Sequence, residues 1–580
     1  MSILKELEKD IIQLIEKAGY HTDKLYLEES NRKDLGEYQL NDAMQLVKTY
    51  HKNPREIASD IVAVLEQDSR FQNINIAGPG FINFSFSEEY IYEILNKMND
   101  DIFSNIDKKE KKKIIIDYGG ANVAKALHVG HLRSANIGEA LKRLSRAMGY
   151  ETLGDAHLGD YGRPLGFVVL EIMKRYKNLP FFDENYTGNY EEIDLPITNE
   201  ELEKLYPIAS EKAKQDPEYL EEGRLVTSKI QNHERGYYDL WKKVVEISKK
   251  DIKNVYDTLN TEFDLWLGES DAEVYIPELQ RIYEEKQLLV DSEGAKIIEI
   301  SKEEDTSPMP PLLFIKSNGT ISYETTDLAT ILQRKKEFNP DEIWYVVDGR
   351  QSLHFEQTFR AARLGQLVED NVVLEHIDFG TMNGKDGKPF KTRDGGVMTL
   401  KNLIELVTNE TRKKISTEVT EEEKEEISTT VAVAALKYAD LLPYRSTDYV
   451  FEIEKFSSLE GKTGPYILYS TIRMKSLLNK VETEERKIRK LKGKSEREIA
   501  LLLLSLQKVM EKSIETKSLN EIAEYLYKLT SSYNTFYGEN RILTEVDEEL
   551  KTSWITLTQI VYNTNMLLLD ILGIKVPKKM

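Results

Sequence analysis

The sequence contains no cysteine, and this absence excludes two ways of stabilising a chain. Without thiols, neither a disulfide framework nor a thiolate metal site can form. The sequence also lacks a long uncharged apolar run, and residues 1–18 carry too much charge for a secretory signal. We therefore expect a cytoplasmic protein with no membrane-spanning segment.

Basic residues are in the minority, since 79 Lys and Arg stand against 100 Asp and Glu, for a formal net charge of -21. Because phosphate binding depends on Lys and Arg, this balance taken alone argues against a nucleic-acid partner. Two stretches differ from the average: residues 461–500 and Lys108–Lys113 carry a local excess of basic side chains. Either stretch is a candidate RNA-binding surface, although a solvated helix face is the commoner explanation of a charge run.

A strand, a glycine-containing loop and a helix are predicted between residues 114 and 148. Ile114–Ile116 indicate a short buried strand, because β-branched side chains suit a sheet covered on both faces. Apolar residues from Ile137 to Met148 recur at spacings of three and four, which predicts an amphipathic helix closed by Gly149. Such a unit presents its loop and helix N-terminus at the carboxyl end of a parallel strand, where open α/β sheets usually bind nucleotides.

His128 and His131 flank Gly130 in that loop. Two imidazoles at a helix start can donate hydrogen bonds to phosphate oxygens, and the glycine allows the backbone to approach a ligand closely. The alternative is a pair of histidines that only cap the helix. A zinc site is less favoured, since cysteine is absent and no third ligand is obvious nearby.

Residues 121–134, Ala-Asn-Val-Ala-Lys-Ala-Leu-His-Val-Gly-His-Leu-Arg-Ser, resemble the HIGH motif of class I aminoacyl-tRNA synthetases, and their flanks resemble the arginyl-tRNA synthetases in particular. Other segments follow in the order of that family. Gly154–Gly162 is similar to a Gly-Asp-Trp-Gly segment near the adenosine, with Tyr161 in place of the tryptophan. Met382–Gly396 matches a degenerate KMSKS loop, and Leu572–Met580 resembles the family's C-terminal ending.

The resemblance implies a multidomain fold that combines α/β and all-α parts. A small α/β N-terminal additional tRNA-binding domain is expected at 1–110, followed by a Rossmann-like catalytic domain at 111–400 with a helical insertion at about 165–300. A helical connector at 401–455 and an all-α DALR anticodon-binding domain at 456–580 complete the chain. The residue patterns themselves predict a strand-turn-strand unit around Gly78–Gly80, later strands at 312–316, 322–323, 343–347 and 372–374, and amphipathic helices at 499–509, 519–537 and 554–572.

The resemblance also implies an arginine-binding set. A planar guanidinium with five donors needs fixed acceptors, and a carboxylate accepts two N–H groups at once. Two of the candidates, a tyrosine and an aspartate four positions apart on one helix turn, are expected to face the same pocket. The implied arginine-binding residues are Asp117, Asn122, Tyr323, Asp327 and Gln351.

The remaining roles concern ATP and tRNA. The lysines of the Met382–Gly396 loop can stabilise a leaving pyrophosphate, whose negative charge grows in the transition state. The resemblance implies that Lys125 compensates for the degenerate sequence of this loop. The expected catalytic residues are His128, His131, Lys125, Lys388 and Lys391. The expected ATP-binding residues are His128, Gly130, His131, Gly159, Asp160 and His354, and Tyr469, Tyr537 and Met580 are expected to contact tRNA.

The function implied by the resemblance is arginine–tRNA ligation. Arginine and ATP would form arginyl-adenylate, which a terminal adenosine hydroxyl of tRNA(Arg) attacks, releasing AMP. Mg²⁺ would accompany the nucleotide, and no protein-bound metal is expected. The chain would act as a monomer. One alternative is a tRNA-binding paralogue that has lost catalysis, for which Tyr161 and the degenerate lysine loop are the motive. Another is an HxGH nucleotidylyltransferase or a class I lysyl or cysteinyl ligase, and the lack of cysteine argues against a zinc-dependent cysteinyl enzyme.

Overall fold

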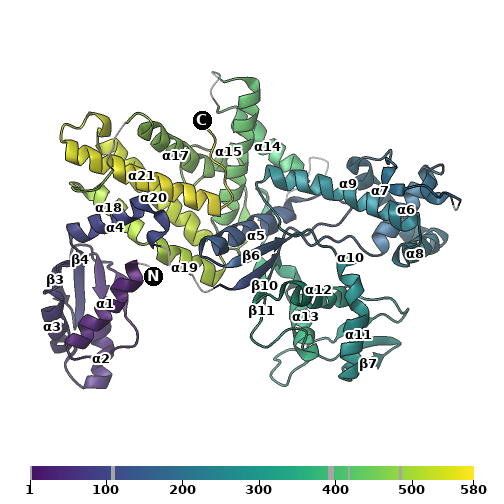
Figure 1. Ribbon diagram of the computed structural model, residues 1–580, viewed down its shortest axis with the longest axis horizontal. Coiled ribbons are helices and arrows are strands. Elements are labelled where there is room, and N and C mark those ends of the chain that lie inside the picture. Colours follow the sequence, from purple (N-terminus) through teal and green to yellow (C-terminus); the bar gives the residue numbers. More distant parts are fainter. Residues whose placement is uncertain (1–2, 106–110, 184, 389–397, 416–418, 482–485) are drawn as a thin grey trace. The chain divides into compact units, whose positions relative to one another are not determined.

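The computed structural model describes residues 3–105, 111–183, 185–388, 398–415, 419–481 and 486–580 (Figure 1). The chain divides into two compact units. Unit 1 contains Met1–Lys108, Tyr469–Lys512 and Glu524–Leu568, and unit 2 contains Lys109–Leu468, Ser513–Ala523 and Leu569–Met580. Among the described residues, no helix is both long and apolar enough to cross a membrane.

Unit 1 begins with a four-stranded antiparallel sheet in the order β1-β2-β4-β3. The predicted strand-turn-strand unit is confirmed, since β3 and β4 flank a turn in which Gly78 has a φ of +55°, a conformation that glycine adopts without strain. Buried Phe84 and Phe86 line the inner side of β4. The elements are α1 (Ile3–Lys17), β1 (Leu27–Glu29), β2 (Tyr38–Leu40), α2 (Asp42–Tyr50), α3 (Pro54–Leu65), β3 (Phe71–Ala77), β4 (Phe81–Phe86), α4 (Glu88–Asp100) and η1 (Ile102–Asn105).

Helices dominate the last part of the chain. The predicted helix at 499–509 is interrupted at Ser505, whose hydroxyl donates to the Leu502 carbonyl and so competes with the helical hydrogen-bond ladder. The predicted helices at 519–537 and 554–572 correspond to α20 and α21. The elements are α17 (Gly464–Leu478), α18 (Lys494–Leu504), α19 (Leu506–Thr516), α20 (Asn520–Glu539), η6 (Ile542–Thr544) and α21 (Glu548–Ile571).

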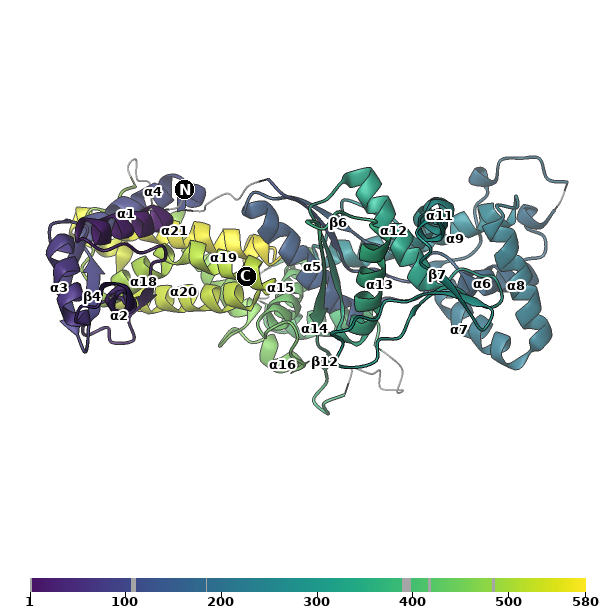
Figure 2. The same cartoon turned by 90° about the horizontal axis from the view of Figure 1, so that it is seen from below.

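The centre of unit 2 is a parallel four-stranded sheet in the order β11-β10-β5-β6. Ile115, fully buried, lies between Ile343 of β10 and Leu153 of β6. Helix α5 covers one face of the sheet, and α12 and α13 cover the other (Figure 2), which is the expected Rossmann-like arrangement. The elements are β5 (Lys113–Asp117), α5 (Val129–Ala147), β6 (Glu151–Asp155), α12 (Tyr323–Phe338), β10 (Glu342–Asp348), η5 (Gly349–Gln351), α13 (Ser352–Gly365) and β11 (Val373–Phe379).

The insertion between the two halves of this sheet is mostly helical, as predicted, and has a hydrophobic core of its own that includes Val168, Leu202 and Leu240. Its elements are α6 (Arg163–Arg175), η2 (Pro180–Phe182), η3 (Tyr190–Glu192), α7 (Asn199–Gln215), α8 (Pro217–Gln231), α9 (Tyr237–Thr258), α10 (Glu269–Ala272), η4 (Glu273–Tyr275) and α11 (Ile276–Glu285).

Of two neighbouring strand predictions, one is confirmed and the other is wrong. The strand predicted at 312–316 exists, but β9 (Leu312–Ile315) belongs to a separate three-stranded antiparallel sheet with β7 (Leu289–Ser292) and β8 (Ala295–Ile298). The strand predicted at 322–323 is wrong. Ser322 is instead the N-cap of α12, because its Oγ accepts the N–H of Thr325 at 3.2 Å and satisfies a free helical donor.

The segment after the parallel sheet is helical, with a short parallel strand pair formed by β12 (Met382–Asn383) and β13 (Tyr449–Val450). Its two longer helices pack against α5 in a core that includes Leu132, Ala135 and Leu436, all fully buried. The helices of this segment are α14 (Leu400–Arg412), α15 (Glu421–Leu441) and α16 (Ile453–Phe456).

Candidate functional site

His128 and His131 build the start of α5. The His128 Nδ1 accepts the N–H of Gly130 at 3.0 Å, and the His131 Nδ1 accepts the N–H of His128 at 3.0 Å. Because each Nδ1 is an acceptor, the proton of each neutral ring lies on Nε2. The two rings are 4.0 Å apart, so capping and ligand binding are compatible: capping uses one nitrogen of each ring and leaves one N–H donor on each.

Both imidazoles are neutral at physiological pH. Burial is the main cause that lowers the pKa of His128, and the nearby charges of Lys125 and Arg350 lower it further. Burial also lowers the pKa of His131, to about 3. The pair therefore offers hydrogen bonds to phosphate oxygens without supplying a permanent positive charge or a proton for acid catalysis.

These histidines face a cavity of about 420 Å³. The cavity lies at the carboxyl ends of the parallel strands and at the N-terminus of α5, where both the strand topology and the helix dipole favour a phosphorylated ligand. Its lining includes Asp117, Asn122, His128, Gly130, His131, His157, Gly159, Glu269, Asp327, Thr330, Tyr345, Asp348, Arg350, Gln351 and His354. The structure thus brings together most of the residues singled out in the sequence.

One end of the cavity is acidic. The Oδ2 atom of Asp327 lies 2.5 Å from Nε2 of His354, and the ring of Tyr323 lies 5.0 Å from the His354 ring. Tyr323 does not line the cavity and is 59% exposed, so its contact with arginine stays a prediction. Beside Asp327, burial raises the pKa of Glu269 to about 8, and the charges of Asp327 and Asp160 raise it further.

Glu269 was missed by the sequence analysis. It begins α10, and its N–H donates to the Leu158 carbonyl, which holds the chain against the loop after β6. The available signal was a carboxylate two positions after the apolar segment Leu265–Leu267, following Gly268. That signal was weak because acidic residues are common throughout this highly charged insertion.

A second group of charges surrounds Asp117, the last residue of β5, which lines the cavity. Nη2 of Arg334 donates to Oδ2 of Asp117 and to Oδ2 of Asp155, both at 2.7 Å, and Arg334 and Asp155 are completely buried. Burial raises the pKa of Asp117, the charges of Arg334 and His157 lower it, and that of Asp155 raises it. Asp117 was predicted from the sequence, whereas Asp155 and Arg334 were not.

Asp117, Asp155 and His157 have the chemistry of metal ligands, and their ligand atoms lie within 4.8 Å of one another. The Arg334 guanidinium already bonds the Oδ2 atoms of both aspartates. A divalent cation would have to displace this buried internal cation, so the cluster does not fit a metal ion.

Several predicted residues do not reach the cavity. Asp160 is 4% exposed and does not line the cavity, and its carboxylate accepts the N–H and the hydroxyl of Ser270 at 3.0 and 2.7 Å. Its contact with ATP stays a prediction. Lys125 is exposed, with Nζ 5.3 Å from the ring centre of Tyr206. Lys388 is exposed too, with its N–H donating to Asp386, and the predicted Lys391 lies outside the described residues.

The predicted tRNA contacts are all at least partly exposed. In unit 1, Tyr469 is 45% exposed, Tyr537 is partly buried, and the Arg473 guanidinium lies 4.6 Å from the ring centre of Tyr537. Neighbouring Tyr533 is completely buried and belongs to the core. Met580 in unit 2 is partly buried.

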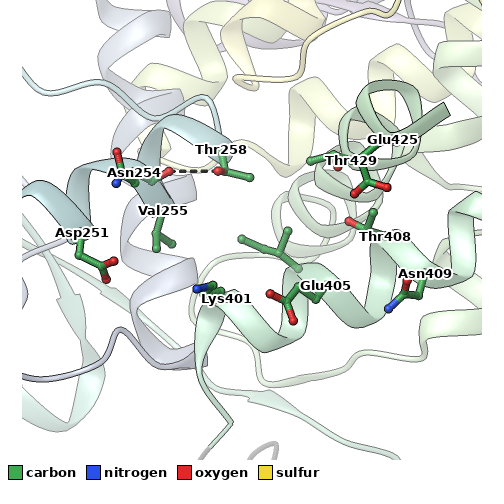
Figure 3. A pocket seen from close by; sticks show the side chains of 11 residues that line it. Asp251, Asn254, Val255, Thr258, Lys401, Glu405, Thr408, Asn409, Glu425 and Thr429 are labelled. Carbon is green, nitrogen blue, oxygen red and sulfur yellow. Dashed lines mark hydrogen bonds between the residues drawn. The ribbon is translucent and has the colours of Figure 1, made fainter. Parts of the chain in front are cut away.

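A larger cavity, of about 680 Å³, lies elsewhere in unit 2 between α9, α14 and α15 (Figure 3). Asp251, Lys401, Glu405 and Glu425 give it mixed charge, and none of the predicted site residues lines it. We assign the site to the smaller cavity, because the strand ends, the helix N-terminus and the two histidines converge only there among these two.

Comparison with known proteins gives matches along the whole chain. Family models match at 5–86 (arginyl tRNA synthetase N terminal domain), 90–453 (tRNA synthetases class I (R), catalytic domain) and 467–580 (DALR anticodon binding domain). The arginine–tRNA ligases of Alkaliphilus oremlandii and Agathobacter rectalis are 42% and 41% identical, each over 100% of both chains. A crystal structure of arginyl-tRNA synthetase from Plasmodium falciparum superposes with a TM-score of 0.79 over 99% of both chains, at 24% identity.

Proposed function

The chain belongs to the arginyl-tRNA synthetase family, and we propose that the cavity at the carboxyl ends of its parallel strands is where arginine and ATP react. The enzyme ligates arginine to tRNA(Arg), forming arginyl-adenylate from ATP and then transferring the arginyl group to the terminal adenosine, with AMP and diphosphate as products. The single observation that carries the site assignment is the convergence of the His128–His131 helix start and the Glu269–Asp327 carboxylates on one cavity.

The acidic end suits the guanidinium of the substrate. Asp327 and Glu269 offer carboxylates on two different elements, and a planar guanidinium bridges two carboxylates through its separate N–H groups. Because Glu269 is largely protonated before arginine binds, the arriving cation makes its ionised form favourable. Gln351 and Asn122 line the same cavity and supply amide groups for the rest of the amino acid.

The other end suits the phosphates of MgATP, with Mg²⁺ arriving as part of the substrate. The Nε2–H groups of His128 and His131 and the close backbone at Gly130 and Gly159 are placed to hold the triphosphate. The arginine carboxylate then attacks the α-phosphorus. No protein nucleophile is involved, so the rate comes from positioning and from electrostatic stabilisation of the leaving diphosphate.

Lysines outside the cavity complete this scheme. Lys125 and Lys388 are exposed and carry positive charges. Lys391, which lies outside the described residues, is three positions after Lys388 in the sequence. We assign them to the diphosphate, which gains negative charge as the bond to the α-phosphorus breaks.

The tRNA is assigned to unit 1 and the C-terminus. Exposed Tyr469, partly exposed Tyr537 and the Arg473 guanidinium provide stacking surfaces and a cation, the groups that bind unpaired bases. We propose that the chain acts as a monomer in the cytoplasm, as the resemblance to the family implies.

The decisive experiment is aminoacylation of total tRNA with each standard amino acid, labelled, in turn. Arginine alone should be incorporated, and only with ATP present. Incorporation of lysine or cysteine would overturn the assignment, and no incorporation at all would favour the tRNA-binding paralogue. That paralogue is not favoured, because His128 and His131 are both present and both line the cavity.

A further inference from the structure

Arg334 is completely buried and does not line the cavity, yet it bonds Asp117, which does. We propose that Arg334 is a positioning residue that fixes the direction in which the substrate arginine binds, by occupying the Asp117–Asp155 carboxylate pair and leaving Asp117 only one oxygen for the substrate's α-ammonium group. This inference deepens the proposed function and rests on the arginine site assigned above.

The substrate has two cationic ends, so an acidic cavity can bind it in two directions. The Asp117–Asp155 pair is itself a guanidinium site, as the Arg334 contacts of 2.7 Å to both carboxylates demonstrate. If that site were empty, the substrate's guanidinium would fit there, and its carboxylate would point away from ATP. With the internal guanidinium in place, only the Glu269–Asp327 end remains for the guanidinium of the substrate.

Arg334 also prepares Asp117 for a compact cation. Only Oδ2 of Asp117 accepts from Arg334, and the 13% of the Asp117 side chain that is exposed faces the cavity. One carboxylate oxygen suits an ammonium group, which is a point charge, better than a forked guanidinium. The Arg334 guanidinium is itself held in place by the Tyr345 ring, whose centre lies 5.4 Å away.

Helix α12 sets the distance between the two ends. Asp327 and Arg334 lie two helical turns apart on nearly the same face, a separation of about 10 Å along the axis. Thr330 lies between them and lines the cavity.

The test compares two ligands that differ in one group. L-Arginine carries the α-ammonium, whereas 5-guanidinopentanoate keeps the carboxylate and guanidinium but lacks the α-ammonium. In Arg334→Ala, Asp117 is no longer held for the substrate's α-ammonium group. The KM for arginine should therefore rise by about tenfold to a hundredfold, the effect of losing one or two charge-assisted hydrogen bonds between Asp117 and that group. The inhibition constant of 5-guanidinopentanoate should not rise, because this ligand has no α-ammonium to lose from Asp117, and the KM for ATP should stay unchanged.

Added guanidinium ion provides the second readout. Millimolar guanidinium chloride should lower the raised arginine KM of Arg334→Ala, because the free ion refills the Asp117–Asp155 pair, and should not improve the wild type. Arg334→Lys keeps the charge without the fork and should be less impaired. Arg360→Ala is the matched control, since Arg360 pairs with Asp305 outside the cavity; its arginine KM should not change.

Each outcome decides a different point. Equal losses for both ligands, no loss for arginine, or no response to guanidinium would overturn the role of Arg334. If Arg334→Ala fails to fold, the two-ligand comparison in Arg334→Lys decides. An unchanged arginine KM in Asp117→Asn would instead show that the proposed arginine site is wrong, whereas a loss in Asp117→Asn with none in Arg334→Ala refutes Arg334 alone.

Discussion

Replacing Asp327 by asparagine tests the acidic end of the cavity directly. The substitution keeps the size of the side chain, removes its charge and turns one acceptor oxygen into a donor. In the structure, Oδ2 of Asp327 lies 2.5 Å from His354, and the side chain is 33% exposed. Asp327→Asn therefore leaves the substrate guanidinium without one of its two carboxylates, in a position that water partly reaches.

The expected loss follows from these surroundings. Two unit charges 4 Å apart attract with about 4 kcal/mol at an effective dielectric constant of 20, typical near a protein surface. Partial exposure weakens this interaction, and Glu269 compensates for some of it, because the charge of Asp327 contributes to the raised pKa of Glu269. A net loss of about 2 kcal/mol remains, which lowers kcat/KM for arginine by about 30-fold.

The assay is steady-state arginylation with L-arginine and its neutral isostere citrulline, with Asp305→Asn as a control for loss of a carboxylate outside the cavity. In Asp327→Asn, kcat/KM should fall by about 30-fold for arginine and by much less for citrulline. The KM for ATP should not change. Equal effects on arginine and citrulline would refute the reasoning, since citrulline brings no charge to be left unpaired.

Three further predictions address other parts of the site. The pKa of Glu269 is about 8, and a bound cation favours its ionised form, so arginine binding at pH 7 should release a proton. For the same reason, arginine affinity should rise with pH up to about 8. Calorimetry in buffers of different ionisation enthalpy would detect the proton release, and release that persists in Glu269→Gln would contradict this prediction. Lys388→Ala should slow adenylate formation in single-turnover experiments much more than it weakens ATP binding, because the charge it meets develops only as diphosphate leaves; an unchanged rate removes Lys388 from the mechanism. Amino-acid activation should require tRNA, because tRNA held at a distance can bias the catalytic domain towards its reactive state; robust ATP–pyrophosphate exchange with arginine alone would disprove it.

The parallel sheet was predictable where the sequence signal was local. Ile114–Ile116 and the apolar spacing after Ile137 define β5 and α5, because burial on both faces of a sheet and on one face of a helix leaves different periods in the sequence. The strand predicted at 322–323 failed for a local reason as well, since Ser322 is a helix cap. The pairing of β9 with β7 and β8 depends on contacts distant in sequence and left no local pattern.

The residues of the candidate site also fall into two groups, those with a local sequence signal and those defined by contacts distant in sequence. His128 and His131 were predictable because their spacing around Gly130 serves one short loop. Arg334 was not, because its partner Asp117 is 217 positions away and its own neighbours suggest an exposed helix face. Lys336, for example, pairs with Glu278 at the surface, so one basic run contains both a buried cation and solvated ones. Only the fold distinguishes them.

An acidic cavity that also binds ATP has to limit its own repulsion of the phosphates. The described structure does this carboxylate by carboxylate. Arg334 neutralises Asp117 from below, and Arg350 donates to both oxygens of Asp348 at 2.8 and 2.7 Å. Glu269, with a pKa of about 8, is mostly uncharged at neutral pH until a cation arrives. The negative charge of Glu269 therefore develops largely when arginine binds, and the arriving cation cancels it together with the charge of Asp327, so recognition of the amino acid and binding of the triphosphate are compatible within one cavity.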